Sequence, residues 1–233
     1  MIDINLQDIK GSYNLVAGLG SWCGPALYSE RHGLRRHSFP LDWMQSPFLP
    51  DVNILLRNKF QGFMEVENII EKDILANYVD DNGYPIFKSG TSESIRAHYV
   101  TDIKYNIDSV HDFPMVPNQD WSVQYPPYKI RLDHRIQTFL NQIAQSQRTL
   151  FIRYEWMPTS YEDVINLKSI LTDMTNGNFN LLLVETVDEE LPGVKDMNFG
   201  TPEDKICWVQ VSRDNCTNTS VWNDLLSVIT LLN

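Results

Sequence analysis

The order of apolar and polar positions divides this chain into segments of two kinds. Continuous apolar runs are typical of strands buried on both faces, whereas apolar residues three or four positions apart indicate a helix with one buried face. The continuous runs are 13–19, 150–156, 179–187 and 206–211. The helical spacing occurs in 52–63, 133–146, 160–174 and 221–232. Asp51 is a plausible N-cap for the first of these helices, and Thr159-Ser160-Tyr161-Glu162 resembles a capping box for the third.

The middle of the chain carries other signals. Residues 78–87 flank Asn82-Gly83, a pair that favours a type I′ turn, so we expect a β-hairpin there. Apolar residues at four-residue intervals in 95–110 fit a helix better than a strand. Residues 111–127 are rich in proline and are expected to be irregular. Two further loops are expected at 38–50 and 188–205.

The last hundred residues alternate between helices and strands. Their order is helix, strand, helix, strand, strand, helix, which is typical of a layered α/β sheet. Right-handed crossovers would make such a sheet largely parallel. No internal repeat, low-complexity segment or domain boundary divides the sequence. We therefore expect a single α/β domain over residues 1–233, with helices flanking a mixed, largely parallel sheet.

Composition and charge narrow the class of protein. The 233 residues are 42% hydrophobic and 21% charged, as in ordinary globular proteins. A net charge of −11 argues against nucleic-acid or anionic-membrane partners, which require a basic face. No apolar run reaches the roughly 18 residues of a membrane span, and the polar segment 1–12 does not resemble a signal peptide. Three cysteines outside any CxxC pattern favour a reducing, cytoplasmic setting without disulfides.

The clearest candidate for chemistry is Cys23. It follows the apolar run 13–19 and a turn with Gly18 and Gly20, and it precedes an expected helix that starts near Pro25 and ends at Gly33. A side chain in this position lies beside the unpaired N–H groups and the positive end of the helix dipole. A thiolate there should be stabilised, with a pKa below the free value of about 8.5. The cysteine is therefore either a nucleophile or a small residue that packs at a tight turn.

The same turn offers backbone donors. Strand, Gly-x-Gly and helix together resemble a dinucleotide-binding turn, but that fingerprint needs a glycine where Cys23 stands. The backbone N–H groups from Gly20 and Ser21 to Gly24 instead suit an oxyanion hole. No histidine pair has HExxH spacing, and no cysteine pairs with a histidine at zinc-finger spacing. We expect neither a metal nor a cofactor.

Two histidines are candidates for a general base. His111 precedes Asp-Phe-Pro in the irregular segment, where functional residues concentrate. His37 follows Arg35 and Arg36, and these two cations should keep its imidazole neutral. His32 is expected to bind the last carbonyl groups of the helix before Gly33.

Arginines and tryptophans suggest a ligand-binding cleft. Arg153 lies within an apolar strand and needs an anionic partner, either an internal carboxylate (Glu155 or Glu185) or a substrate group at the carboxyl ends of the strands. Arg36 and His37 are candidates for the same binding role. Trp43 is expected either to line this cleft or simply to pack beside the neighbouring prolines.

Four motifs together resemble one known family. They are LGSWC at 19–23, GLRRHSFPLDW at 33–43, VHDF at 110–113 and LFIR at 150–153. The pattern is similar to a family of papain-like cysteine peptidases found mainly in bacteria and large DNA viruses. The resemblance covers about two-thirds of the chain and is strongest from Leu19 to Trp43.

The resemblance implies a role for particular residues. Cys23 corresponds to the nucleophile and His111 to the base, with Asp42 or Asp112 orienting the imidazole ring. It also implies peptide, isopeptide or acyl substrates, and a papain-like α+β fold as the alternative to the layered sheet.

Two other functions remain open from the residues alone. One is a transferase on a doubly wound sheet that binds a phosphorylated or sugar substrate through Arg35, Arg36 and Arg153. The other is a non-catalytic binding protein, which would retain the cleft without the chemistry. Replacing Cys23 by Ser would abolish activity only if the cysteine is the nucleophile.

Overall fold

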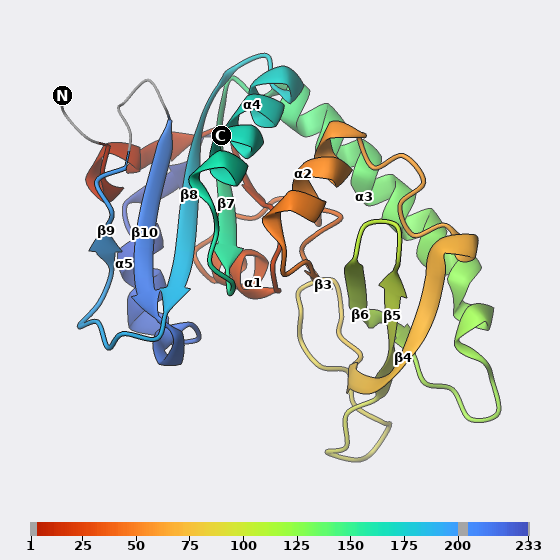
Figure 1. Cartoon of the computed structure of the whole chain (residues 1–233). Coiled ribbons are helices and arrows are strands. Elements are labelled where there is room, and N and C mark those ends of the chain that lie inside the picture. Colours follow the sequence, from red (N-terminus) through yellow and green to blue (C-terminus); the bar gives the residue numbers. More distant parts are fainter. Residues whose placement is uncertain (1–3, 200–204, 233) are drawn as a thin grey trace.

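The continuous apolar runs form the strands of one five-stranded sheet. The computed structural model describes residues 4–199 and 205–232. The strand order is β2-β7-β8-β10-β9, and the first four strands are parallel (Figure 1). These strands are β2 (Leu15–Gly18), β7 (Arg148–Glu155), β8 (Asn178–Val187), β10 (Ile206–Ser212) and β9 (Lys195–Asp196). Because parallel strands run the same way, the chain leaves β2, β7, β8 and β10 at one common edge.

Helices cover both faces of this sheet, which explains why its strands are apolar throughout. One face packs against α2 (Leu49–Arg57), α3 (Tyr125–Gln145) and α4 (Tyr161–Met174). The other packs against α1 (Gly24–Arg31) and α5 (Thr219–Leu226). The pattern of Phe151 on one face and Ile152 on the other shows the alternation within β7.

A second, antiparallel sheet lies beside the first, and α3 extends along both (Figure 1). Its order is β3-β6-β5-β4. The strands are β3 (Met44–Gln45), β4 (Ile69–Asn77), β5 (Arg96–Asp102) and β6 (Ile107–Pro114). The chain ends add a small parallel pair, β1 (Gly11–Tyr13) with β11 (Ile229–Leu231). Four short 3₁₀ helices complete the described elements, at Leu6–Ile9, Val66–Asn68, Trp121–Gln124 and Arg213–Asn215.

The helix predicted for 95–110 is wrong, because this segment forms β5 and the start of β6. The carboxylate of Asp102 accepts hydrogen bonds from the backbone N–H groups of Lys104 (2.8 Å) and Tyr105 (3.0 Å). Such a bond from an aspartate to the main chain just after it favours a turn over a helix. Asn106, with φ of 52°, completes the connection between the two strands.

The segment predicted to be irregular, 111–127, is ordered at both ends. Its first residues complete β6, and α3 begins at Tyr125. Pro126 and Pro127 occupy the first turn of α3, where the missing N–H removes no hydrogen bond. The hairpin expected at 78–87 is present as a short antiparallel pairing around Val79 and Pro85, with backbone hydrogen bonds from Asp80 to Tyr84 and from Ile86 to Tyr78 (3.0 Å each). Its turn is not type I′, because Gly83 has a positive φ and Asn82 does not.

Helix boundaries follow the local signals in most cases. α1 starts directly after Cys23, and Gly33 has the positive φ of 66° expected beyond a helix end. The capping residue of α4 lies one position later than the predicted Thr159–Glu162 box: Ser160 is the N-cap, and its hydroxyl accepts the N–H of Asp163. Asp51 lies within the first turn of α2, so its prediction as the N-cap is wrong. The expected final helix stops at Leu226, before β11.

The α/β class is confirmed: five α-helices in the described part of the chain accompany a five-stranded, mostly parallel sheet and an antiparallel sheet. The antiparallel sheet was not expected. Residues 1–3 of the polar lead-in and 200–204 of the acidic loop lie outside the described residues. Among the residues described, no helix has the length and apolar character needed to cross a membrane.

Candidate functional site

Cys23 lies at the common carboxyl edge of the parallel strands, as the N-cap of α1. The chain reaches it from β2 through two residues with φ of 79°, Gly20 and Ser21. A positive φ is uncommon for serine and is retained only where surrounding contacts enforce it. Among the described residues, no side chain caps the first turn of α1, where Gly24 and Ala26 carry N–H groups and Pro25 carries none.

Ser46 enforces the conformation of Ser21. The N–H of Ser21 donates to the Ser46 hydroxyl (2.9 Å), and the N–H of Ser46 donates to the carbonyl of Ser21 (3.1 Å). A Cβ added to Gly20 would overlap the Ser46 Oγ. The tight turn therefore requires both the left-handed backbone and the absence of a side chain at position 20.

The guanidinium of Arg153 joins the two segments. Nη1 donates to the carbonyl of Leu19 (2.8 Å) and the hydroxyl of Ser46 (2.9 Å), and Nη2 donates to the carbonyl of Ser46 (2.6 Å). Nε donates to Glu155 Oε1 at 2.5 Å, and the arginine is fully buried. The structure thus provides the internal carboxylate partner. All the hydrogen bonds of Arg153 go to backbone carbonyl groups, to the Ser46 hydroxyl and to Glu155. We therefore assign Arg153 a role in positioning the turn.

Only one of the two carboxyl oxygens of Glu155 has a hydrogen-bond partner among the described residues. Its second oxygen, Oε2, is buried and has no hydrogen-bond partner among the described residues. Burial raises the pKa of Glu155, and the adjacent Arg153 acts in the opposite direction. Glu185 is its register neighbour on β8 and accepts a hydrogen bond from Gln210 (3.0 Å). The interior of this edge is consequently polar and acidic.

The pKa of Cys23 is raised by burial, so the predicted lowering is wrong. Loss of hydration disfavours a thiolate more than the neighbouring backbone dipoles favour it. Trp22, the residue before the cysteine, packs its ring against Tyr154 and Trp156 with centroid separations of 5.7 and 5.4 Å. These three rings form an apolar surface beside this part of the turn. A Cβ on Gly24 would overlap the Trp22 ring. In the described structure Cys23 is a partly buried thiol.

His111 lies in β6 and not in a loop. Its Nδ1 is 2.7 Å from the carbonyl oxygen of Asn77, which can only accept, so Nδ1 carries the proton. That tautomer leaves Nε2 as an acceptor. Among the residues that the structure describes, no hydrogen bond or ion pair joins His111 to Cys23.

The two candidate orienting acids contact other partners. Asp112 accepts hydrogen bonds from Ser109 Oγ (2.8 Å) and Arg135 Nη1 (3.3 Å). Asp42 accepts from the N–H of Phe39 (2.8 Å) and from Arg35 Nε (3.3 Å), and burial raises its pKa. The group that orients the His111 ring is therefore the Asn77 carbonyl.

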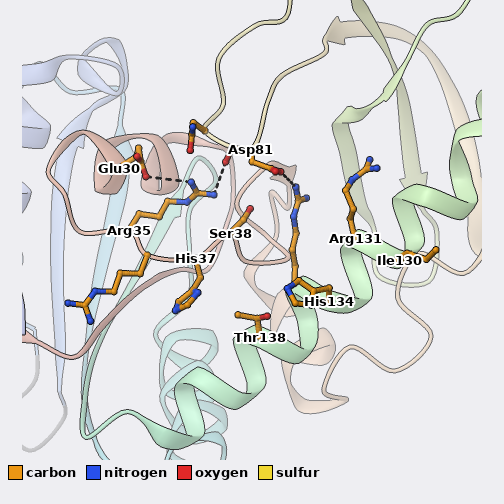
Figure 2. A pocket seen from close by; sticks show the side chains of 12 residues that line it. Glu30, Arg35, His37, Ser38, Asp81, Ile130, Arg131, His134 and Thr138 are labelled. Atoms are coloured by element: carbon orange, nitrogen blue, oxygen red, sulfur yellow. Dashed lines mark hydrogen bonds and ion pairs between the residues drawn. The ribbon is translucent and has the colours of Figure 1, made fainter. Parts of the chain in front are cut away.

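A pocket of about 690 Å³ opens between the loop after α1, the 78–87 turn and α3 (Figure 2). Its lining is mostly polar and basic: Glu30, Arg35, Arg36, His37, Ser38, Asp81, Asn82, Ile130, Arg131, His134, Arg135 and Thr138. Burial, and secondly the Arg36 charge, lower the pKa of His37, as expected for a neutral imidazole. Trp43 lies outside this lining, buried beneath the Arg35 guanidinium at 5.2 Å.

Sequence reasoning missed the contribution of α3 to this pocket. Arg131, His134, Arg135 and Thr138 recur at helical spacing, which places them on one face. This four-residue spacing was the signal in the sequence that could have revealed the contribution of α3.

His98, expected on a helix, lies on β5, and its Nδ1 is 2.6 Å from the carboxylate of Glu71.

Other titratable groups have structural roles. His32 Nδ1 bonds the carbonyl of Tyr28 at 2.8 Å near the end of α1, as predicted. Cys207 is fully buried in β10, and burial raises its pKa. Among the residues that the structure describes, no three His, Cys, Asp or Glu side chains form a group able to hold a metal ion.

Comparisons with known proteins give a matching family and a matching relative. The family model described as "Putative papain-like cysteine peptidase (DUF1796)" matches residues 14–188. A relative from Acanthamoeba polyphaga mimivirus, "Uncharacterized protein R408", is 27% identical over 177 residues, covering 72% of this chain and 77% of the viral protein. No solved structure matches the chain significantly. The matched region contains Cys23, His111 and the whole lining of the basic pocket.

Proposed function

Because the chain belongs to the family described as "Putative papain-like cysteine peptidase (DUF1796)", whose model matches residues 14–188, we propose that it catalyses thiol-dependent acyl transfer with Cys23 as the nucleophile. The observation that carries the proposal is the position of Cys23 at the junction of β2 and α1. A sharp strand-to-helix turn presents a nucleophile at the carboxyl edge of a sheet beside free backbone donors. The substrate class is a peptide, isopeptide or other acyl compound.

The N–H groups at the start of α1 support an oxyanion hole. No side chain of the described residues caps them, and they lie next to the thiol that would attack the carbonyl carbon. Negative charge that develops on the carbonyl oxygen would be stabilised by these donors and by the helix dipole. Arg153 supports this arrangement, because its guanidinium donates hydrogen bonds to the carbonyl groups of Leu19 and Ser46 and so holds both residues in place.

Since burial raises the pKa of Cys23, the nucleophile requires a base that removes its proton during attack. We assign this role to His111, whose Nε2 is the acceptor in the tautomer that Asn77 enforces. No hydrogen bond joins the two side chains among the described residues, and we propose that the proton transfer takes place in the substrate complex.

The proposed reaction has two steps. Cys23 Sγ attacks the acyl carbon and passes its proton to His111, which returns that proton to the departing amine, alcohol or thiol. Water then attacks the resulting thioester and loses a proton to His111. The C–S bond breaks, the acyl group leaves as a carboxylic acid, and His111 returns the proton to Cys23 Sγ. If another nucleophile replaces water, the same chemistry gives an acyl transferase.

An acyl-trapping experiment tests the nucleophile. Incubation with p-nitrophenyl acetate should give an acetyl thioester that mass spectrometry locates on Cys23. Cys23→Ser should remove both the adduct and nitrophenol release above background, whereas Cys216→Ser, a change at a half-exposed cysteine outside the turn, should alter neither. His111→Asn should slow acylation by roughly 100-fold or more, the range for loss of a general base. Equal acetylation of all cysteines, or full activity in Cys23→Ser, would refute the proposal.

A further inference from the structure

The ring of His111 reaches across the antiparallel sheet to a strand that β6 does not pair with. β5 lies between β6 and β4 in the strand order (Figure 1), yet Nδ1 of His111 bonds the carbonyl of Asn77, the last residue of β4, at 2.7 Å. The pairing of β5 with β6 is irregular between His98 and Val100, which pair with residues on either side of His111. A bulge of this kind redirects side chains and is frequent beside active sites. It accounts for a ring that reaches past β5 to β4.

The backbone of Asn77 is held in place by its own side chain. Asn77 Oδ1 accepts hydrogen bonds from Arg96 Nη1 (2.9 Å) and from Ser94 Oγ (2.9 Å). A guanidinium can only donate, so the amide atom that faces it must be the oxygen. Arg96 Nη2 also donates to the carbonyl of Leu75 (2.7 Å). One guanidinium on β5 therefore binds two residues at the end of β4.

The end of β4 needs such contacts, because its main-chain pairing is weak. β4 is the edge strand of its sheet, and its register with β5 shifts between Lys72 and Leu75. Beyond Asn77 the chain leaves the strand for the 78–87 turn. Among the residues that the structure describes, the hydrogen bonds of the Arg96 side chain all go to these oxygens of β4. The arginine thus fixes the segment whose carbonyl binds His111.

We propose that Arg96 is a positioning residue for His111, acting through Asn77. This proposal rests on the proposed function, in which His111 Nε2 takes the proton of Cys23. A neutral imidazole without partners exchanges between two tautomers, and only the form with hydrogen on Nδ1 presents Nε2 as an acceptor. The Asn77 carbonyl selects that form, because a carbonyl accepts and cannot donate. Arg96 keeps the carbonyl within reach of the ring, so the tautomer and the direction of Nε2 depend on it.

The surroundings of His111 suit this role. The imidazole is half-buried, and no hydrogen bond among the described residues engages Nε2. Asp112, the next residue along β6, binds other side chains through its carboxylate. The Asn77 carbonyl therefore orients the ring without competition from the neighbouring acid.

Nitrogen NMR of the ¹⁵N-labelled full chain tests the proposal without a turnover assay. At alkaline pH, where histidine is neutral, His111 should show a protonated Nδ1 and an unprotonated Nε2, and loss of these signals in His111→Gln assigns them. Arg96→Met removes both donors and should give a mixture of the two tautomers, whereas Arg96→Lys keeps one donor and should restore part of the wild-type population. Arg57→Met is the matched control, because Arg57 also donates to an asparagine side-chain oxygen, that of Asn166 on α4. It should leave the His111 signals unchanged.

Acylation by p-nitrophenyl acetate provides a second readout. Arg96→Met should lower kcat by roughly tenfold or more with little change in KM, the effect of a displaced catalytic group. Combined with His111→Asn, the same substitution should cause no further loss, because its effect passes through His111. Arg96 is exposed, so the variant should fold normally, which a thermal melt would verify. Ser94→Ala removes the other donor to Asn77 and should shift the tautomer in the same direction.

Four results would overturn the proposal. They are a wild-type His111 with hydrogen on Nε2, an unchanged tautomer in Arg96→Met, an equal change in Arg57→Met, and an additional loss of rate when Arg96→Met is combined with His111→Asn. Failure of the proposed function gives a different result. Full activity in Cys23→Ser together with a tautomer shift in Arg96→Met would refute the acyl transfer and leave the link from Arg96 to His111 intact.

Discussion

The turn that carries Cys23 depends on Arg153, a single buried residue. Its guanidinium contacts Leu19, Ser46 and Glu155, and it is completely inaccessible to solvent. A buried arginine of this kind is stabilising only while every partner remains in place, because removing one member leaves an unpaired charge or unpaired carbonyl groups.

Arg153→Met should destabilise the protein by about 3–5 kcal/mol, since it leaves the Glu155 carboxylate without its cation. Urea denaturation followed by circular dichroism would measure the change. The double variant Arg153→Met with Glu155→Met should recover part of the loss, because both charges are then absent. A change below about 1 kcal/mol in the single variant would contradict the positioning role given to Arg153.

The reactivity of Cys23 should follow its raised pKa. A higher pKa leaves a smaller thiolate fraction at any given pH, and only the thiolate reacts with iodoacetamide. Alkylation of Cys23 at pH 8 should therefore be slower than that of N-acetylcysteine, and its rate should still be rising above pH 9. Mass spectrometry of the digested protein would assign the rate to Cys23. A plateau below pH 8 would show that the thiol is activated in the free protein.

At the scale of elements, a glycine lies on each side of α1, Gly20 before it and Gly33 after it. Comparing them separates the effect of a left-handed backbone from the effect of close packing. Gly20 has φ of 79° and also lies against Ser46 and Leu41. Gly33, after α1, has φ of 66°, but no atom of the described residues lies within 4 Å of the point that a Cβ would occupy there. The two glycines thus share a left-handed backbone and differ in available space.

Gly33→Ala should cost about 1 kcal/mol, the penalty for a Cβ in the left-handed region. Gly20→Ala should lose roughly 1–3 kcal/mol more, because the methyl group must also displace Ser46. Denaturant midpoints of the two variants provide the comparison. Equal losses would mean that backbone conformation alone, and not close packing, selects glycine at position 20.

At the scale of the whole molecule, one apolar cluster extends across both sheets. It contains Ala17 and Phe151 from the parallel sheet, and Val100 and Phe113 from the antiparallel sheet. α2 and α3 contribute Leu55 and further side chains to the same cluster. Because the two sheets share buried surface, neither can lose its packing without exposing part of the other.

The shared cluster predicts a single cooperative unfolding transition, in keeping with the expected single domain. Urea curves from far-ultraviolet circular dichroism and from tryptophan fluorescence should coincide, since both sheets unfold together. Trp208 reports on the parallel sheet and Trp121 on the region beside the antiparallel sheet. Two separated transitions would show that the sheets are independent folding units.

Predictions succeeded where local patterns carry the information. The strands at 150–156 and 179–187 were found because both faces are buried and the runs are therefore apolar throughout. Residues 95–110 were assigned to a helix because four-residue spacing also arises by chance in strands with bulges, and the register of β5 with β6 shifts between His98 and Val100.

Local sequence patterns predicted only part of the candidate site. The order of strand, turn, cysteine and helix placed Cys23 at the start of α1. The direction of its pKa shift was missed, because burial depends on distant residues such as Trp156 that pack around Trp22. The partner of Arg153 was among the expected alternatives, whereas its contact with Ser46 was not foreseeable from spacing.

The sequence by itself determined the α/β class, the core strands, the start of α1 at Cys23 and the family, because each depends on residues that are neighbours along the chain. Tertiary structure alone decided three other features. It bonded His111 to Asn77, joined Arg153 to Ser46, and brought the basic face of α3 against the loop after α1. These contacts connect segments 30 or more residues apart, and which segments meet depends on how the two sheets pack, a property of the whole chain.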